Sequence, residues 1–537
     1  MANNNQNEGV LTQCGGKCGY TPTIIIPGIG QSKVFRLDDN GNRMKNEAPA
    51  GINFPVSMNT HKLIKTLALP VLKMIFTHKD KGFTNRASKA IGTCFLPSAV
   101  GINGKPVNNL QAEKYLKSAA RCTEEERAFI YSCIPLAEAS EEAGDDHIYF
   151  LGFNSFGNNL DTAAELYEMI QLVKKETGHD KVNIVPISLG GTIAVSLLHF
   201  YPQVSNDLDK IVFIVPGLDG TKFFADIYGG NFNTDEDFYR KSILSSAKGF
   251  KRHLLGAAMI LVPKGVIVDL LRKTFDEIRN ILLLNSTVMW GSVPCEDYQE
   301  LADKLLSDDA HAEIHRQTDL FHEGQANMQA NIIKFIESGV RIFDIVDYNH
   351  PLHKFVNSSK NYNGDGWVNI ESASLGATSG LLDQPLPTGY VQQNAHCSNP
   401  AHNHLSPDGI VDASTGILPE TTFYFRNQDH ELTAENDVII RLVSELLLHD
   451  EIKNVFSQPD KFPQFNTGRA TGHLRNTLLP KAASIDSSKL SAADSAELLA
   501  AVNECKSMLA ETIVDAERAV RVEERLKKIL SKIGAVL

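Results

Sequence analysis

Residues 182–202 read VNIVPISLGGTIAVSLLHFYP, and this stretch decides the fold. Its first part is a short apolar, partly β-branched run typical of a buried strand, and its last part has apolar residues at helical spacing. Ser188 stands at the junction, followed by Gly190 and Gly191. A strand that turns at a serine into a helix is a nucleophile elbow, in which small residues let strand and helix approach and the hydroxyl projects at the top of a sheet. Pro186 replaces the first glycine of the common G-x-S-x-G pattern, so the alternative is a serine in a tight turn of another fold.

The same alternation of strand and helix runs through the chain on both sides of this elbow. A crossover helix is predicted between 154 and 181, with Gly178 at its carboxyl end. The alternation predicts an α/β fold with a mostly parallel central sheet and helices on both faces. The continuous apolar centres fit strands buried on both faces. The predicted strands are 21–29, 146–154, 181–188, 210–217, 340–349 and 421–427.

Two long stretches interrupt the alternation, within 33–144 and across 221–334, and insertions of this size usually form caps or lids. The core is therefore expected in residues 21–220 and 335–455. We also expect a flexible N-terminus over 1–20, a linker over 456–483 and a charged helical segment over 484–537, the last for packing or for a partner.

The composition is that of a globular protein, with 537 residues, 42% of them hydrophobic, and a net charge of −12. The charges are dispersed, which argues against nucleic acid as a partner. The first residues show neither a basic nor an apolar signal region, so the expected location is cytoplasmic, or outside the cell if a signal was removed. The apolar runs 62–76 and 253–271 contain Lys or Pro and are poor membrane spans, but either could cover a pocket, touch a lipid interface or form ordinary core.

A serine nucleophile needs an imidazole base and a carboxylate behind it, and both follow Ser188 in the chain. Asp365 lies between glycines in NYNGDGWVNIESASLG, and His430 follows a predicted strand in TTFYFRNQDHELTAEND. We expect these three residues to form a catalytic triad. Asp219 and Asp347, at the ends of other strands, are the alternative acids.

The site would also need an oxyanion hole, formed by two backbone N–H groups aimed at the developing negative charge. Leu189, directly after the nucleophile, is expected to supply one. Ile29 is expected to supply the other, because Gly28 and Gly30 let the backbone of IIIPGIGQS turn towards the site.

Together these motifs resemble the lipase and lecithin:cholesterol acyltransferase branch of the α/β-hydrolases. The resemblance rests on PGIGQS, KKETGHDKV, the PISLGG elbow, GDGWVNIESA and the late histidine, and covers about 21–220 and 335–450. The stretch STVMWGSVPCEDY resembles a lid segment, which makes Trp290 a candidate for the lid or acyl pocket. The resemblance implies hydrolysis or transfer of acyl esters, of lipidic or bulky substrates, through an acyl-enzyme on Ser188. A ligand-binding protein without catalysis is a further alternative.

One polar loop, NAHCSNPAHNHLSPDGIVD, combines imidazole, thiol and carboxylate groups. This mixture suits a structural zinc ion, although a polar loop near the active site has the same composition. No other cofactor is expected. Cys14 and Cys18, close together in QCGGKCGY, could pair or bind a soft metal, but are read first as surface thiols. The candidate zinc ligands are His396, Cys397, His402 and His404, with Asp408 and Asp412 nearby.

Overall fold

In the computed structural model of the chain the core is one seven-stranded sheet in which every neighbouring pair is parallel. The structure describes residues 15–45, 48, 51–57, 60–245, 256, 259–466, 474, 478–486, 490–509 and 516–533. All six predicted strands form, and a seventh, β13, joins the edge. The strands, in spatial order, are β13 (Phe465–Asn466), β12 (Thr422–Arg426), β7 (Arg341–Tyr348), β6 (Leu208–Ile214), β5 (Val182–Pro186), β1 (Thr23–Ile26) and β4 (Ile148–Phe150).

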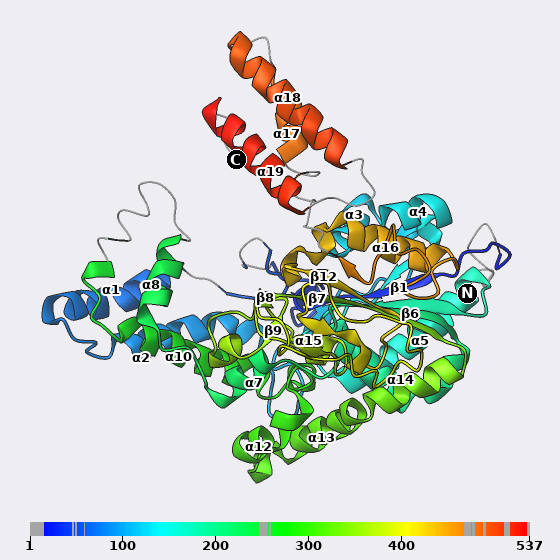
Figure 1. Cartoon of the computed structure of the whole chain (residues 1–537). Coiled ribbons are helices and arrows are strands. Elements are labelled where there is room, and N and C mark those ends of the chain that lie inside the picture. The colour runs from blue at the N-terminus through cyan, green and yellow to red at the C-terminus, as the bar shows by residue number, and fades with distance from the viewer. Residues whose placement is uncertain are drawn as a thin grey trace, which may run out of the picture.

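Helices cover both faces of this sheet. Successive side chains of a strand point to opposite sides, and apolar side chains on both sides need to be buried. In β1, Ile24 and Ile26 pack into one core with α5 (Asn159–Thr177), α6 (Gly190–Phe200) and α14 (Met328–Glu337). Ile25 packs into the other core with α3 (Glu124–Cys133), α4 (Ala137–Ala143) and α16 (Asp437–Leu448). Figure 1 shows these two layers above and below the strands. The expected α/β fold class is confirmed.

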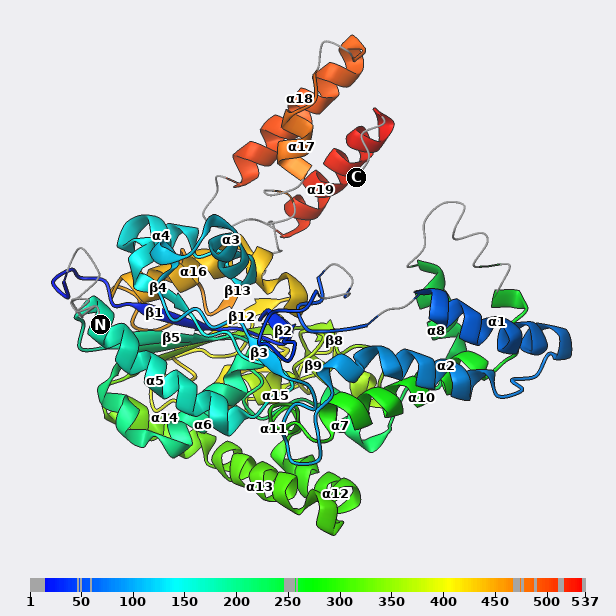
Figure 2. The same ribbon diagram turned by 180° about the vertical axis from the view of Figure 1, so that it is seen from behind.

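The two interrupting stretches contribute to a shared helical projection. From the first come α1 (Thr60–Thr77) and α2 (Phe83–Gly92), and from the second α8 (Glu236–Ser245) and α10 (Val266–Ile278). Helix α2 packs against α1 and α10, and α8 packs against α10. Figures 1 and 2 show the four helices together, extending away from the sheet.

Other parts of these stretches belong to the main body. Helices α3 and α4 lie within 33–144 yet cover the sheet, because they bury an apolar face that includes Ile130 and Ala139. The second stretch also supplies α7 (Lys222–Gly229), α11 (Thr287–Trp290), α12 (Cys295–Leu305) and α13 (Ala312–Ala326), of which α13 packs on α6.

Short elements complete the body. Three two-stranded ladders are β2 (Val34–Arg36) with β3 (Leu110–Ala112), β8 (His350–Pro351) with β9 (Asn363–Gly364), and β10 (Thr378–Ser379) with β11 (Val411–Asp412). The body also contains two short helices, α15 (Ile370–Ala373) and η9 (His430–Glu435), and the second begins at His430.

The end of the chain forms a small helical unit with its own core. Helices α17 (Leu479–Ala483), α18 (Ala492–Leu509) and α19 (Ala516–Lys532) bury side chains such as Leu498, Met508 and Leu526 against one another. The stretch 456–483, expected as a linker, contains both β13 and α17. Among the described residues, no helix combines the length and apolar character needed to cross a membrane. Of the N-terminal stretch 1–20, residues 1–14 lie outside the described residues.

Candidate active site

Ser188 follows β5 directly and is held in the backbone conformation expected of an elbow. Its φ is 52°, a left-handed value that costs a residue with a side chain about 1–3 kcal/mol. Gly190 has no room for a Cβ, because the carbonyl oxygen of Ile26 in β1 occupies that space, and a Cβ on Gly191 would lie 3.1 Å from that of Pro216. The two glycines therefore allow α6 to begin against the strands. Pro186, the departure from the pattern, is buried within β5.

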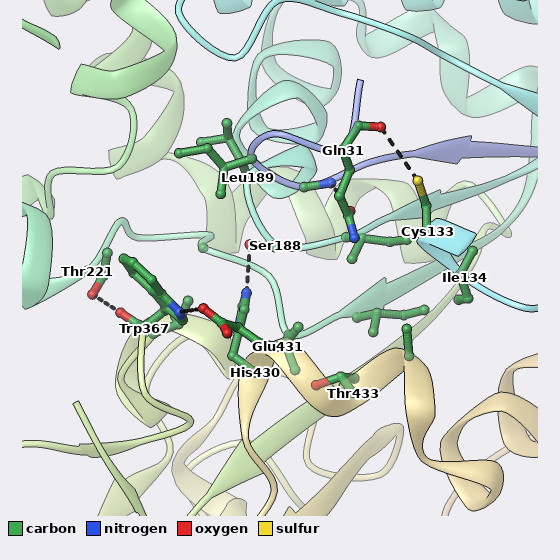
Figure 3. Close-up of a pocket in the computed structure, with 18 of the residues that line it drawn as sticks. Gln31, Cys133, Ile134, Ser188, Leu189, Thr221, Trp367, His430, Glu431 and Thr433 are labelled. Carbon is green, nitrogen blue, oxygen red and sulfur yellow. Dashed lines mark hydrogen bonds between the residues drawn. The ribbon is translucent and has the colours of Figure 1, made fainter. Parts of the chain in front are cut away.

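The structure brings Ser188, Asp365 and His430 together above the carboxyl ends of the strands. The Oγ of Ser188 lies 2.8 Å from Nε2 of His430, and Nδ1 of the same ring lies 2.7 Å from Oδ2 of Asp365 (Figure 3 shows the Ser188–His430 pair). The backbone N–H of His430 donates to the carbonyl oxygen of Asp365 at 2.9 Å. Three residues far apart in the sequence thus form one continuous hydrogen-bonded chain.

The acid is held by backbone groups that leave one oxygen for the imidazole. Asp365 is 1% exposed, and its Oδ1 accepts hydrogen bonds from the N–H groups of Trp367 (2.9 Å) and Val368 (2.7 Å). Because Oδ1 is occupied, Oδ2 faces His430, which fixes the proton of the ring on Nδ1 and leaves Nε2 as the acceptor for the serine hydroxyl.

The two alternative acids are engaged elsewhere. Asp219 accepts from the backbone N–H of Cys295 at 3.0 Å, and Asp347 accepts from the hydroxyl of Thr433 at 2.7 Å. Burial, followed by the charge of Asp365, raises the pKa of Asp347 well above its usual value. In the described part of the chain, neither of these carboxylates bonds to His430.

The electrostatic environment of His430 favours its protonated form. Burial by itself lowers the pKa of His430, but the charge of Asp365 and the hydrogen bond to it, with Asp429 and Glu431, outweigh burial. The net pKa of the imidazole is therefore raised above 6.5. An imidazole of this kind can accept a proton and hold it as an ion pair with the carboxylate.

The backbone N–H groups predicted for an oxyanion hole differ from those of their neighbours in having no acceptor among the described residues. The N–H of Gly28 donates to Oε1 of Gln31 (2.7 Å) and that of Gly30 to the hydroxyl of Ser155 (3.0 Å). Within the residues that the structure describes, the N–H groups of Ile29 and Leu189 have no acceptor. Gly28 lies against Ser188, because a Cβ there would be 3.1 Å from Cβ of Ser188. The role of these groups in an oxyanion hole stays a prediction.

Ser188 and His430 line a cavity of about 280 Å³ with mostly apolar walls. The walls come from several distant segments, among them the loop after β1, α7, Trp367 and Val368 in the loop after Asp365 (the acid loop), and α16 (Figure 3). Within the described residues, no side chain of α1, α8 or α10 lines this cavity, and so none of the described residues of the apolar runs 62–76 and 253–271 does. Its apolar lining includes Ile134, Ile187, Val215, Phe224 and Ile439.

Trp290 does not line the cavity, contrary to the expectation for a lid tryptophan. It is 0% exposed, its ring lies tilted against Tyr228 and edge-to-face with Tyr298, and its indole N–H donates to the carbonyl of Leu284 at 2.8 Å. Trp290 is a core residue of the segment between β6 and β7 because its ring is surrounded by apolar side chains from α7, α12 and α13.

The tryptophan that does line the cavity is Trp367, which the sequence reasoning did not select. Its indole N–H donates to Glu431 at 3.3 Å, and its carbonyl accepts from the hydroxyl of Thr221. Trp367 therefore connects the acid loop to α7 and to the residue after His430. The signal available in the sequence was its position two residues after Asp365. Gln31 was also passed over, although it lies inside the quoted PGIGQS motif.

Three of the four candidate zinc ligands in the polar loop gather, and one does not. Ligand atoms of Cys397, His402 and His404 all lie within 4.8 Å of one another, whereas His396 is exposed and outside this group. His404 is fully buried; its Nδ1 lies 2.9 Å from Oε1 of Gln464, and its Nε2 has no hydrogen-bond partner among the described residues. Together with the thiol of Cys397 and the imidazole of His402, this buried nitrogen forms a set of ligands that fits a metal ion. Zinc binding there stays a prediction, without His396.

Comparison with solved structures gives matches of low sequence identity. No protein-family model and no curated protein matches the chain. Among solved structures, the Tle4–Tli4 complex matches at 12% identity, with a TM-score of 0.26, over 61% of this chain and 74% of that one. A lipase-esterase related protein from Clostridium acetobutylicum ATCC 824 matches at 12% identity, with a TM-score of 0.15, over 35% of this chain and 86% of that one.

Proposed function

We propose that this protein is a serine hydrolase that cleaves carboxylic esters with an apolar acyl group through an acyl-enzyme on Ser188. The observation that supports it best is the pair of hydrogen bonds at His430, 2.8 Å to the hydroxyl of Ser188 and 2.7 Å to Asp365. In this arrangement the hydroxyl has a base within reach, and the base has a carboxylate that stabilises its charged form.

The proposed reaction has two halves. In the first, Oγ of Ser188 attacks the ester carbonyl carbon while its proton passes to Nε2 of His430, and the N–H groups of Ile29 and Leu189 bind the resulting oxyanion. The intermediate collapses, the C–O bond to the alcohol breaks, and His430 returns the proton to the departing alcohol. In the second half, water attacks the acyl carbon with His430 again as base, the bond to Oγ breaks, and His430 returns the proton to Oγ of Ser188 as the carboxylic acid is released.

The cavity argues for an apolar acyl group. A volume of about 280 Å³ with mostly aliphatic and aromatic walls favours burial of a hydrocarbon chain, at about 0.8 kcal/mol for each buried methylene. The same triad would serve an acyltransferase, in which a sterol or lipid hydroxyl replaces water in the second half. Product analysis with one acyl ester, with and without a sterol acceptor, separates the two reactions.

Covalent labelling with a fluorophosphonate is the direct test. The folded chain should be labelled once, the label should map to the peptide that contains Ser188, and the Ser188→Ala variant should stay unlabelled. A matched control is Ser155→Ala, which removes the hydroxyl that accepts from Gly30 but leaves the nucleophile in place. A folded wild-type chain that takes up no more label than Ser188→Ala would reject the proposal in favour of a ligand-binding protein.

A further inference from the structure

Three side chains that could bind a metal meet at the amino ends of three neighbouring strands. Cys18 precedes β1, His147 is the residue directly before β4, and His179 lies three residues before β5. The strands β4, β1 and β5 are adjacent and parallel, so their amino ends lie at one edge of the sheet. Figure 2 shows these strands side by side near the mark of the N-terminus. Ser188 follows the carboxyl end of β5, so the group lies at the edge opposite the proposed active site.

The three ligand atoms are close enough to share one ion. The Sγ of Cys18 lies 3.2 Å from Nε2 of His147 and 3.4 Å from Nε2 of His179, and all three atoms lie within 4.8 Å of one another. A tetrahedral zinc ion with bonds of about 2.3 Å to sulfur and about 2.0 Å to nitrogen sets an S···N separation of about 3.5 Å. The observed separations match the edges of such a tetrahedron.

The tautomer of His147 is already set for metal binding. Its Nδ1 lies 2.9 Å from Oδ1 of Asp146, a carboxylate that accepts the proton of that nitrogen. The lone pair is then on Nε2, which faces the sulfur of Cys18. His147 is 3% exposed, so this lone pair is aimed into the group and not into water. Metal-bound histidines commonly have such a carboxylate behind them, which fixes the ring and raises its basicity.

One thiol proton cannot be donated to both imidazole nitrogens at once, and both lie within 3.4 Å of the sulfur. A neutral cysteine has one S–H proton, and two imidazole nitrogens lie within reach of the sulfur, as does the carbonyl of Tyr20 at 3.6 Å. A cation between a thiolate and two imidazole lone pairs satisfies all three ligand atoms at once. One sulfur and two nitrogens are the donor types that Zn²⁺ prefers.

We propose that Cys18, His147 and His179 bind a structural Zn²⁺ that joins the segment before β1 to the amino ends of β4 and β5. The segment already lies close to the turn that carries His179, since Gly16 has no room for a Cβ because of the carbonyl of Gly178. The ion would hold the first strand of the chain between two strands that follow it by more than a hundred residues. This site is independent of the proposed esterase function.

Metal content of variants of the full-length chain tests the proposal. Zinc per chain is measured by elemental mass spectrometry of the purified protein. The zinc content of each variant is compared with that of the wild type, so zinc bound at another site does not affect the comparison. Cys18→Ser and His147→Ala should each hold one zinc fewer than the wild type. Cys94→Ser, a half-buried thiol outside the group, is the matched control and should hold as much as the wild type. Cys18 is only partly buried, so its variant keeps the test open if His147→Ala does not fold.

Two further measurements examine the chemistry of the site. Co²⁺ added to metal-free protein should give a thiolate-to-cobalt charge-transfer band of equal intensity in the wild type and in Cys94→Ser, and the band should be weaker by one site's contribution in Cys18→Ser. Asp146→Asn, which weakens the support behind His147, should lower zinc affinity by about 10–100-fold. Equal zinc in the wild type and in Cys18→Ser would overturn the proposal, and so would a disulfide between Cys14 and Cys18 in the purified protein.

Discussion

Replacing Asp365 by Asn should leave the site assembled but give the imidazole the wrong tautomer. In the wild type Oδ1 accepts from the N–H groups of Trp367 and Val368, so the asparagine must keep its oxygen on that side. Its NH₂ group then faces Nδ1 of His430, which has to become an acceptor, and the ring proton moves to Nε2. Nε2 can then no longer accept the proton of Ser188.

The expected loss follows from removing the base while keeping the cavity and the oxyanion donors. We expect kcat/KM for a soluble ester to fall by about 10³- to 10⁴-fold, or about 4 to 5.5 kcal/mol, with a small change in KM. The assay is hydrolysis of a p-nitrophenyl ester, together with the rate of fluorophosphonate labelling.

The control for this substitution is Asp347→Asn. Asp347 is buried, burial raises the pKa of its carboxyl well above the usual value, and it accepts a hydrogen bond from Thr433, so an amide at this position should be tolerated. A loss of less than about tenfold in Asp365→Asn would refute the reasoning, and so would an equal loss in both variants.

Four other outcomes are expected. Because the pKa of His430 is raised and only its neutral form accepts a proton, the labelling rate should rise with pH and reach half its maximum above pH 6.5; a midpoint below that value contradicts the assignment. Gly28→Ala should slow hydrolysis by about 10²-fold, since a Cβ would press on the nucleophile and shift the oxyanion loop, and wild-type rates would remove that loop from the mechanism. Cys397→Ser should lose one zinc per chain while His396→Ala keeps it, as elemental analysis would show; no difference between the two would end the prediction of zinc in the polar loop. Phe76→Ser, at an 82% exposed apolar position of α1, should weaken co-sedimentation with lipid vesicles without changing hydrolysis of a soluble ester, and unchanged binding would count against a lipid contact there.

The local elements of the core could be predicted because each leaves a periodic pattern in the sequence. A strand buried on both faces, such as β5, is a continuous apolar run, and in the helix after Ser188 apolar residues recur at helical spacing. Pairing partners of very short strands leave no such pattern. This is why β13, two residues long, was absorbed into an expected linker although it pairs with β12.

The wrong assignment of Trp290 has a related cause. A tryptophan before a proline is compatible both with a lid and with a core, and only the packing of Tyr228 and Tyr298 around it decides for the core. His396 was grouped with Cys397 because the two are adjacent in sequence, yet neighbouring residues in an irregular loop point in different directions, and His396 is exposed.

The sequence by itself determined the strands and crossover helix, the turn at Ser188 and the order in which Ser188, Asp365 and His430 follow one another, because these depend on residue type and local spacing. Only the tertiary structure decided which aspartate meets His430 and which tryptophan lines the cavity. It alone also brought Cys18 to His147 and His179. Asp365 and His430 are 65 positions apart in the chain, and Cys18 is 129 positions from His147 and 161 from His179. No local pattern encodes the strand order, so these contacts exist only once the parallel sheet has put distant strand ends at the same edge.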